Sequence, residues 1–365
     1  MNILYKFSLL VFLLPALLCA GPGNGTHTKT KKLSKNFTVH KNCLVDIRNE
    51  FGSVTITTWD KPTVSIDITV EVNGNNEQRV KEQLRSIDVI FEASASRVSA
   101  RTDAQQKSNN SNGLWNTLFH SNSNQSSNMK IDYIIKMPVT ASLDISNDYG
   151  AIILDRLKGP AKIKCDFGRL DIGQLLADNN YLKFDYTNNS HIDYMKSGTI
   201  RADFSGFELH GAEKIEYKGD YTKGKFENVK YLEFNGDFCT IQSEMAVKIV
   251  GRGDYSTIKL GLIKESVDLN TDFGSISITE LGLGFKKATI KSEYTGIKVG
   301  YHPEASFRFD IDTAFASIKL SDDLIITRSE NDGTDKQKSG YCGTQRSTAV
   351  ITLRSSFGGV SLKKN

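Results

Sequence analysis

The stretch Asp272-Phe273-Gly274-Ser275-Ile276-Ser277-Ile278 shows the pattern that decides the fold: an acidic residue, an aromatic residue, a small residue, and then aliphatic residues at alternate positions. Residues 50–56, 148–152 and 166–172 repeat it closely, and weaker copies follow as far as residue 357. The aromatic residues of these copies define a structural repeat: Phe51, Tyr149, Phe167, Tyr186, Phe204, Tyr221, Phe238, Tyr255, Phe273, Tyr294, Phe315 and Phe357.

The spacing of these aromatic residues indicates the type of repeat. Between Tyr149 and Phe315 the steps are 18, 19, 18, 17, 17, 17, 18, 21 and 21 residues. The last step, to Phe357, is 42 residues, which predicts one coil whose aromatic residue is missing. Units this short are below the roughly 40 residues of a propeller blade, and they lack the period of helix-pair repeats. The spacing therefore indicates a solenoid of short β-strands.

Residue parity predicts the structure of each unit. Val267, Leu269 and Phe273 share one parity, so on a strand they would face the same side. Ile276 and Ile278 have the opposite parity. A regular strand cannot change sides, so we expect a corner or bulge at the intervening glycine. Each unit is then a strand, a corner, a strand and a turn.

Stacking such units places each strand about 4.8 Å from its equivalent one coil away, which forms a parallel β-helix. We therefore predict an all-β fold, a single-stranded parallel β-helix, with the repeat aromatics stacked inside it. The residue two positions before each aromatic is mostly small, as at Asn147, Ala202 and Gly236. A small residue there would leave room beside an inward ring.

Two stretches depart from the repeat. Residues 61–102 contain two alternating strands around a short helical pattern that includes Val80 and Leu84, which predicts a β-α-β cap on the open end of the solenoid. Residues 103–129 are rich in Ser and Asn and predict a flexible loop. We assign residues 1–20 to a signal peptide, 21–35 to a basic tether and 36–365 to the solenoid domain.

The N-terminus has the features of a secretory signal: Lys6, an apolar run over residues 7–18, and small residues at Ala20 and Gly21. Cleavage after Ala20 is one outcome, and a lipid anchor at Cys19 is the alternative. Both predict an exported protein in the periplasm, at the outer membrane or on the cell surface.

Charge and reactive residues exclude several classes of function. A net charge of +4 over 365 residues gives no reason to expect a nucleic-acid partner. The six histidines have no metal-ligand spacing, and neither a GxSxG elbow nor a phosphate-binding loop is present. We therefore predict no catalytic residues, no cofactor and no metal. Cys165 and Cys239 lie four repeat aromatics apart, too far for a bridge, and are predicted to be free thiols.

Two charged rows run along the repeat. An acidic residue precedes most of the aromatics, and a basic residue often lies two positions before that, as at Lys183 and Asp185. We interpret the rows as mutual charge compensation, with the aspartates also accepting backbone N–H bonds at the corner. Calcium bound along the acidic row is the alternative, but the Gly-Asp-rich turns of calcium-binding repeats are absent.

A small apolar cluster interrupts the polar loop: Leu114, Trp115, Leu118 and Phe119. An exposed cluster of this kind is typical of a partner-binding site. The alternative is that the segment folds back on the solenoid as a lid.

The motifs NEFGSVTITTWD (residues 49–60) and NDYGAIILDRL (residues 147–157), with the later DFG and DYS copies, resemble the bacterial putative-adhesin domain family, which is common in Bacteroidota. The resemblance covers about residues 36–365 and implies a right-handed β-helix on an exported protein. It supplies no catalytic residues or ligands.

These observations predict a non-catalytic envelope or cell-surface β-solenoid that acts as an adhesin-like binding or scaffold protein, with an envelope protein or a glycan as partner. One alternative, which the resemblance permits, is an envelope-stress accessory component linked to a sigma/anti-sigma system. A second is a glycan-active β-helix enzyme, but acidic residues that recur in almost every coil do not mark a single catalytic site.

Overall fold

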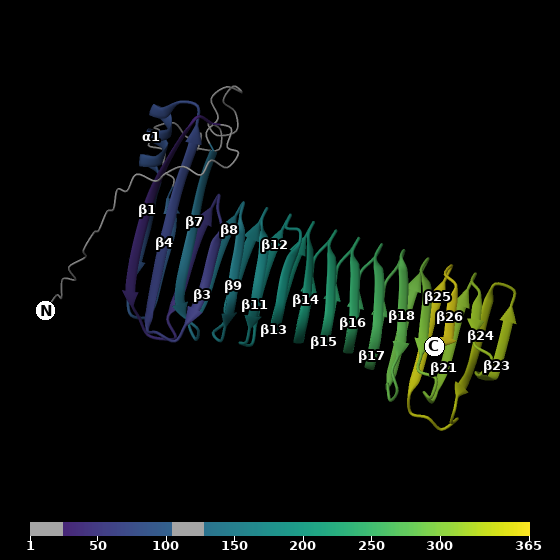
Figure 1. Cartoon of the computed structure of the whole chain (residues 1–365). Coiled ribbons are helices and arrows are strands. Elements are labelled where there is room, and N and C mark those ends of the chain that lie inside the picture. Colours follow the sequence, from purple (N-terminus) through teal and green to yellow (C-terminus); the bar gives the residue numbers. More distant parts are fainter. Residues whose placement is uncertain (1–24, 104–127) are drawn as a thin grey trace. The chain divides into compact units, whose positions relative to one another are not determined.

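The computed structural model describes residues 25–103 and 128–365. These residues are almost entirely β-strands, and they contain one helix (Figure 1). The predicted all-β solenoid is confirmed, because most strands pair in parallel with the equivalent strand of a neighbouring coil. The chain divides into two compact units, Met1–Ile153 and Leu154–Asn365. Within the described residues, no helix has the length and apolar character needed to cross a membrane.

Unit 1 combines two stacked coils with an antiparallel end. Its elements are β1 (His27–Thr38), β2 (Leu44–Glu50), β3 (Val54–Trp59), β4 (Thr63–Gly74), α1 (Glu77–Ser86), β5 (Asp88–Ala93), β6 (Arg97–Asp103), β7 (Asn128–Pro138), β8 (Ser142–Asp148) and the start of β9 (Ala151–Leu157). β2 pairs in parallel with both β6 and β8, and β3 pairs in parallel with β7. β4 pairs antiparallel with β1 and β7, and β5 pairs antiparallel with β6, so the parallel stacking ends at these strands.

The predicted strand, helix and strand within residues 61–102 are present as β4, α1 and β5. Asn76 caps the helix, because its side chain accepts a hydrogen bond from the Arg79 backbone N–H at 3.0 Å. Val80 is buried.

The predicted tether at 21–35 is wrong from His27 onward. Residues 27–38 form β1, which pairs with β4 along its whole length. The basic residues of this strand meet acidic partners on the neighbouring elements: Lys29 lies 3.1 Å from Glu77, and Lys31 lies 3.3 Å from Asp88. Pairing with β4 orders this strand, and its lysines discourage pairing with other chains.

Unit 2 is a stack of coils, each with one strand before the repeat aromatic and one after it. Its elements after β9 are β10 (Ala161–Asp166), β11 (Arg169–Leu175), β12 (Asn180–Asp185), β13 (Ser190–Asp203), β14 (Gly206–Lys218), β15 (Lys223–Asn235), β16 (Thr240–Arg252), β17 (Thr257–Asn270), β18 (Ser275–Leu281), β19 (Lys287–Glu293), β20 (Gly296–Tyr301), β21 (Phe307–Ala314), β22 (Ile318–Leu320), β23 (Ile325–Asp332), β24 (Asp335–Cys342), β25 (Val350–Ser356) and β26 (Val360–Lys364).

The last segment of the chain does not form the last coil. β25 pairs in parallel with β19 on one side and β21 on the other, and β26 lies in the same way between β20 and β22 (Figure 1). The 42-residue step to Phe357 is therefore not a coil that lacks its aromatic, and that prediction is wrong. After β22 the chain forms β23 and β24, and β24 pairs antiparallel with β23 and with β21. The chain then returns, and β25 and β26 occupy the coil position between β19–β20 and β21–β22.

The core of unit 2 contains its own aromatic residues. Phe184, Phe207 and Phe226 are buried, and the Phe207 ring makes edge contacts with the other two at 5.6 and 5.4 Å between centroids. Among the described residues, Cys43, Cys165, Cys239 and Cys342 are buried and form no disulfide, as predicted for Cys165 and Cys239.

Candidate functional site

A row of exposed aromatic side chains follows unit 2 along its coils. We call it the aromatic ladder, and its members in spatial order are Phe167, Tyr186, Phe204, Tyr221, Phe238, Tyr255, Phe273, Tyr294, Phe357 and Phe315. Neighbouring rings are 4.7–5.1 Å apart between centroids and lie within 6° of parallel. In unit 1, Phe51 and Tyr149 stack in the same manner at 5.3 Å.

The rings stack as predicted, but the prediction that they point inward is wrong. Their exposed fractions run from 42% at Phe273 to 61% at Phe315. The cause is the backbone: every repeat aromatic has a φ between 50° and 63°, in the left-handed region. A residue with that conformation forms the corner itself, so the alternation of inward and outward side chains along the strand does not extend to it. Its side chain projects outward, while Leu269 before it and Ile276 after it are buried.

This conformation makes the ladder costly to build. A left-handed backbone costs a non-glycine residue about 1–2 kcal/mol, and glycine or asparagine would accept the corner more readily. Stacking contributes about 0.5–1.5 kcal/mol per pair beyond the burial of ring area, so packing offsets the strain. Strained residues recur at functional sites, and here the strain is repeated in every coil of the ladder.

The exposed area of the ladder is large for a monomer. About half of the 150–250 Å² of each ring, summed over the ladder, gives roughly 1,000 Å². The largest apolar patch on an ordinary monomer is about 300–600 Å². Because each ring covers the faces of its neighbours, the surface presents ring edges, and the tyrosine hydroxyls recur about every 10 Å, two strand spacings.

Beside the ladder the acidic row forms a second ordered feature. Each carboxylate Oδ1 accepts a hydrogen bond from the backbone N–H of the acidic residue one coil further along, as Asp203 does from Asp220 at 2.8 Å. The same bond recurs at 2.7–3.2 Å from Asp166 through to Asp272. The predicted acceptance of backbone N–H groups is thus correct, but the donor belongs to the next coil and not to a local turn.

The predicted charge compensation is only partly present. Lys183 lies 3.2 Å from Asp185 of the acidic row. Lys218 and Arg252 instead pair with Glu216 and Asp268, which lie outside that row. The backbone N–H groups, and not mainly the basic row, therefore stabilise the stacked carboxylates.

Inside five of the corners a hydroxyl residue follows the aromatic residue and completes the hydrogen bonding. Ser205 donates to the Asp203 carbonyl at 2.8 Å and accepts from the Thr187 backbone N–H at 3.1 Å. The equivalent residues of other coils make one or both of these bonds, and they are Thr187, Thr222, Ser256 and Thr295. The corner is thus fixed from both sides, which holds each aromatic residue in place.

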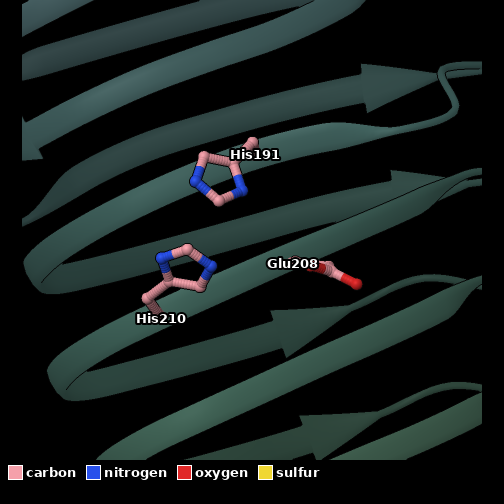
Figure 2. A group of neighbouring side chains, drawn as sticks. All are labelled: His191, Glu208 and His210. Carbon is pink, nitrogen blue, oxygen red and sulfur yellow. The ribbon is translucent and has the colours of Figure 1, made fainter.

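A second cluster lies on the outward side of β13 and β14. Donor atoms of His191, Glu208 and His210 lie within 4.8 Å of one another (Figure 2). The search for metal-ligand spacing missed this group because its members come from consecutive coils. The signal is His191-x-Asp193 followed 17 residues later by Glu208-x-His210, at outward parity in both coils.

The predicted partner site at Leu114, Trp115, Leu118 and Phe119 lies outside the described residues. It stays a prediction.

Comparison with known proteins adds little about function. No family model matches the chain, and no curated protein matches it. A crystal structure of a putative cell adhesion protein from Clostridium sporogenes shares 12% identity, covering 92% of this chain and 100% of that chain with a TM-score of 0.19. A putative adhesin from Parabacteroides distasonis shares 13% identity, covering 76% of this chain and 94% of that chain with a TM-score of 0.31. Superpositions at these TM-scores carry no argument about what this chain binds.

Proposed function

We propose that the protein is a non-catalytic, exported adhesin-like protein, and that the aromatic ladder is the surface through which it contacts its partner. The observation that carries the proposal is the exposure of a continuous row of strained, stacked aromatic rings along unit 2. A soluble protein rarely leaves such an apolar row uncovered unless it binds something.

The geometry of the ladder favours a polypeptide partner over a sugar. Sugars are recognised by stacking on the faces of aromatic rings, and here the faces are covered by neighbouring rings within 6° of parallel. Ring edges can pack against aliphatic side chains, and the regular tyrosine hydroxyls can hydrogen-bond to a backbone. We therefore expect a protein of the envelope or of another surface, with an extended apolar segment.

The acidic row supports a binding role over a catalytic one. From Asp166 to Asp272 each carboxylate of the row uses Oδ1 to accept a backbone N–H, so the row has a structural task in these coils. General acid–base work requires a carboxyl group that can gain and lose a proton next to the substrate. A repeated, hydrogen-bonded row does not meet that requirement.

The test is a binding experiment with a chain that lacks residues 1–20. The labelled protein is applied to a panel of matrix proteins, to envelope proteins of the producing bacterium and to a glycan array. The ladder variant carries Phe204→Asn, Tyr221→Asn and Phe238→Asn, because asparagine keeps the left-handed corner while removing the ring. The matched control is Tyr231→Asn, a partly exposed aromatic outside the ladder.

We expect saturable binding to a protein surface. The affinity should be at least tenfold lower for the ladder variant and unchanged for the control. Equal binding by wild type and ladder variant would show that the ladder is not the contact surface. Binding confined to glycans would overturn the polypeptide partner, and release of shortened glycan products would overturn the non-catalytic assignment.

A further inference from the structure

Two histidines from consecutive coils meet on the outward side of unit 2. The strand register pairs His191 of β13 with Glu208 of β14, and His210 lies two residues beyond Glu208 on the same side. The His191 and His210 rings are 4.2 Å apart between centroids in an edge-to-face arrangement. Figure 2 shows the two imidazoles facing each other across neighbouring strands, with Glu208 beside them.

Asp193 hydrogen-bonds the His191 ring and lies close to the His210 ring. Its Oδ1 lies 3.0 Å from His191 Nε2 and 3.6 Å from His210 Nδ1. A carboxylate can only accept, so in the neutral His191 ring Nε2 carries the hydrogen and Nδ1 carries the lone pair. Metal-binding histidines commonly have their second nitrogen on a carboxylate in this way, which fixes the ring and makes it a better ligand.

We propose that His191, Glu208 and His210 bind a divalent transition-metal ion, with Zn²⁺ as the ion that this donor set fits, and that Asp193 positions the two imidazoles. Two histidines and one carboxylate form the protein part of many zinc sites, in which a water molecule takes the fourth position. Donors of a tetrahedral zinc site lie about 3.3 Å apart, from Zn–N distances near 2.0 Å. The three donors lie within 4.8 Å, so modest rotation of partly exposed side chains brings them to the ion.

The charges around the cluster favour a cation. Asp171 of β11 lies beside His191 in the strand register, and Lys225 of β15 lies beside Glu208. The Lys225 ammonium lies 3.1 Å from Glu227 and 3.5 Å from Glu244, and the same oxygen of Glu227 lies 3.8 Å from His210 Nε2. Carboxylates therefore outnumber the one competing cation.

The cluster also breaks the repeat. Neighbouring outward positions of unit 2 carry Lys–Glu pairs such as Lys230–Glu213 and Lys248–Glu265, which are usual on a solvated strand face. Within residues 25–103 and 128–365, His191, Glu208 and His210 are the one group of at least three His, Cys, Asp or Glu side chains with this geometry. A site for a single metal ion is expected to interrupt a structural repeat at one place, and this cluster does so.

Isothermal titration of ZnCl₂ into the tag-free chain at pH 7.5 tests the proposal. We expect one ion per chain. His191→Ala and His210→Ala should each weaken binding at least tenfold, and Asp193→Asn should weaken it about tenfold through the loss of ring orientation. The matched control is His40→Ala, which removes an exposed histidine of unit 1 and should leave binding unchanged.

The pH dependence gives a second readout. Protons compete with a metal ion for imidazole nitrogens, so the zinc affinity should be lower at acidic pH than at pH 7.5. Circular dichroism confirms that each variant is folded. Zinc affinity that is unchanged in a chain with both His191→Ala and His210→Ala would overturn the proposal, as would the absence of saturable binding in the wild type. The ladder variant should bind zinc normally, which separates this site from the proposed partner surface.

Discussion

The carboxylate of Asp237 accepts a hydrogen bond from the backbone N–H of Asp254 at 2.7 Å, although the two residues belong to consecutive coils. A row of like charges spaced by one strand separation would be repulsive on its own. Here each negative charge meets a backbone donor that the next coil presents at the corner. The acidic residue of the repeat is therefore a connection between coils.

This relationship predicts different effects for two substitutions at one position. Asp237→Ala removes the acceptor for the Asp254 N–H and should lower the free energy of unfolding by about 1–3 kcal/mol. Asp237→Asn keeps an acceptor oxygen and removes one charge from the row, so it should cost less than about 1 kcal/mol. Urea unfolding of both variants measures the difference, with Glu213→Ala as a surface control. Equal losses in the two variants would show that charge, and not the hydrogen bond, sets the effect.

A second prediction compares an outward and an inward aromatic residue of one coil. Phe234 is buried, so Phe234→Ala should cost about 3–5 kcal/mol. Phe238→Asn removes a ring that is 48% exposed and relieves the strain of its φ of 56°, so it should cost less than about 2 kcal/mol. The two unfolding free energies test the orientation of the ladder. A larger loss at Phe238 than at Phe234 would contradict it.

The sequence predicts the repeat well because the signal is local. The coil length, the presence of a corner in each unit and the alternation of buried residues follow from spacing and parity, and the strands before and after Phe273 confirm them. The corner expected at Gly274 lies instead at Phe273, which has the left-handed backbone. The direction of the ring does not follow, because parity holds only for extended backbone and Phe273 has a φ of 53°. Asparagine or glycine would have signalled the left-handed corner, but an aromatic residue does not.

Relationships between coils are the part that the sequence could not supply. The insertion of Phe357 between Tyr294 and Phe315 joins segments that are not consecutive in the chain. The meeting of His191 with His210 depends on a register that only the stacked coils define. Once the structure fixes which residues of each coil point outward, residues about 17 positions apart in the sequence can be recognised as neighbours on adjacent coils.

A third prediction concerns alkaline pH. Burial raises the pKa of Tyr133 to about 12, against about 10 in an unfolded chain. The folded chain thus keeps a proton that the unfolded chain loses, so this contribution to stability is complete below pH 10 and disappears as the pH rises through 12. Over that range the loss is about 2–3 kcal/mol.

Tyr133→Phe isolates this contribution. The substitution leaves Thr102 a partner, because its hydroxyl also donates to Asn49 at 3.0 Å. Urea unfolding between pH 9 and pH 11.5 should show a shallower decline of stability in Tyr133→Phe than in the wild type. Parallel declines would mean that Tyr133 ionises at the same pH in the folded and unfolded chains.

The last prediction concerns the inserted C-terminal coil. β19 forms hydrogen bonds to β25 along residues 287–293, and β20 pairs with β26, so both depend on a segment that follows them by about sixty residues. Removal of residues 345–365 deletes β25 and β26 and leaves a gap of one coil between β19 and β21. The deletion would then leave unpaired those backbone groups of β19, β20, β21 and β22 that had bonded to the deleted strands.

Hydrogen exchange in the truncated chain should therefore lose protection at those backbone groups of residues 287–320 that bonded to the deleted strands, while β14 to β16 keep theirs. A chain that ends at Leu362 is the matched control, because it retains the buried residues Leu353, Val360 and Leu362 and should exchange like the wild type. If the coils instead stacked in chain order, truncation would expose only the coil next to the deletion, and residues 287–301 would remain protected.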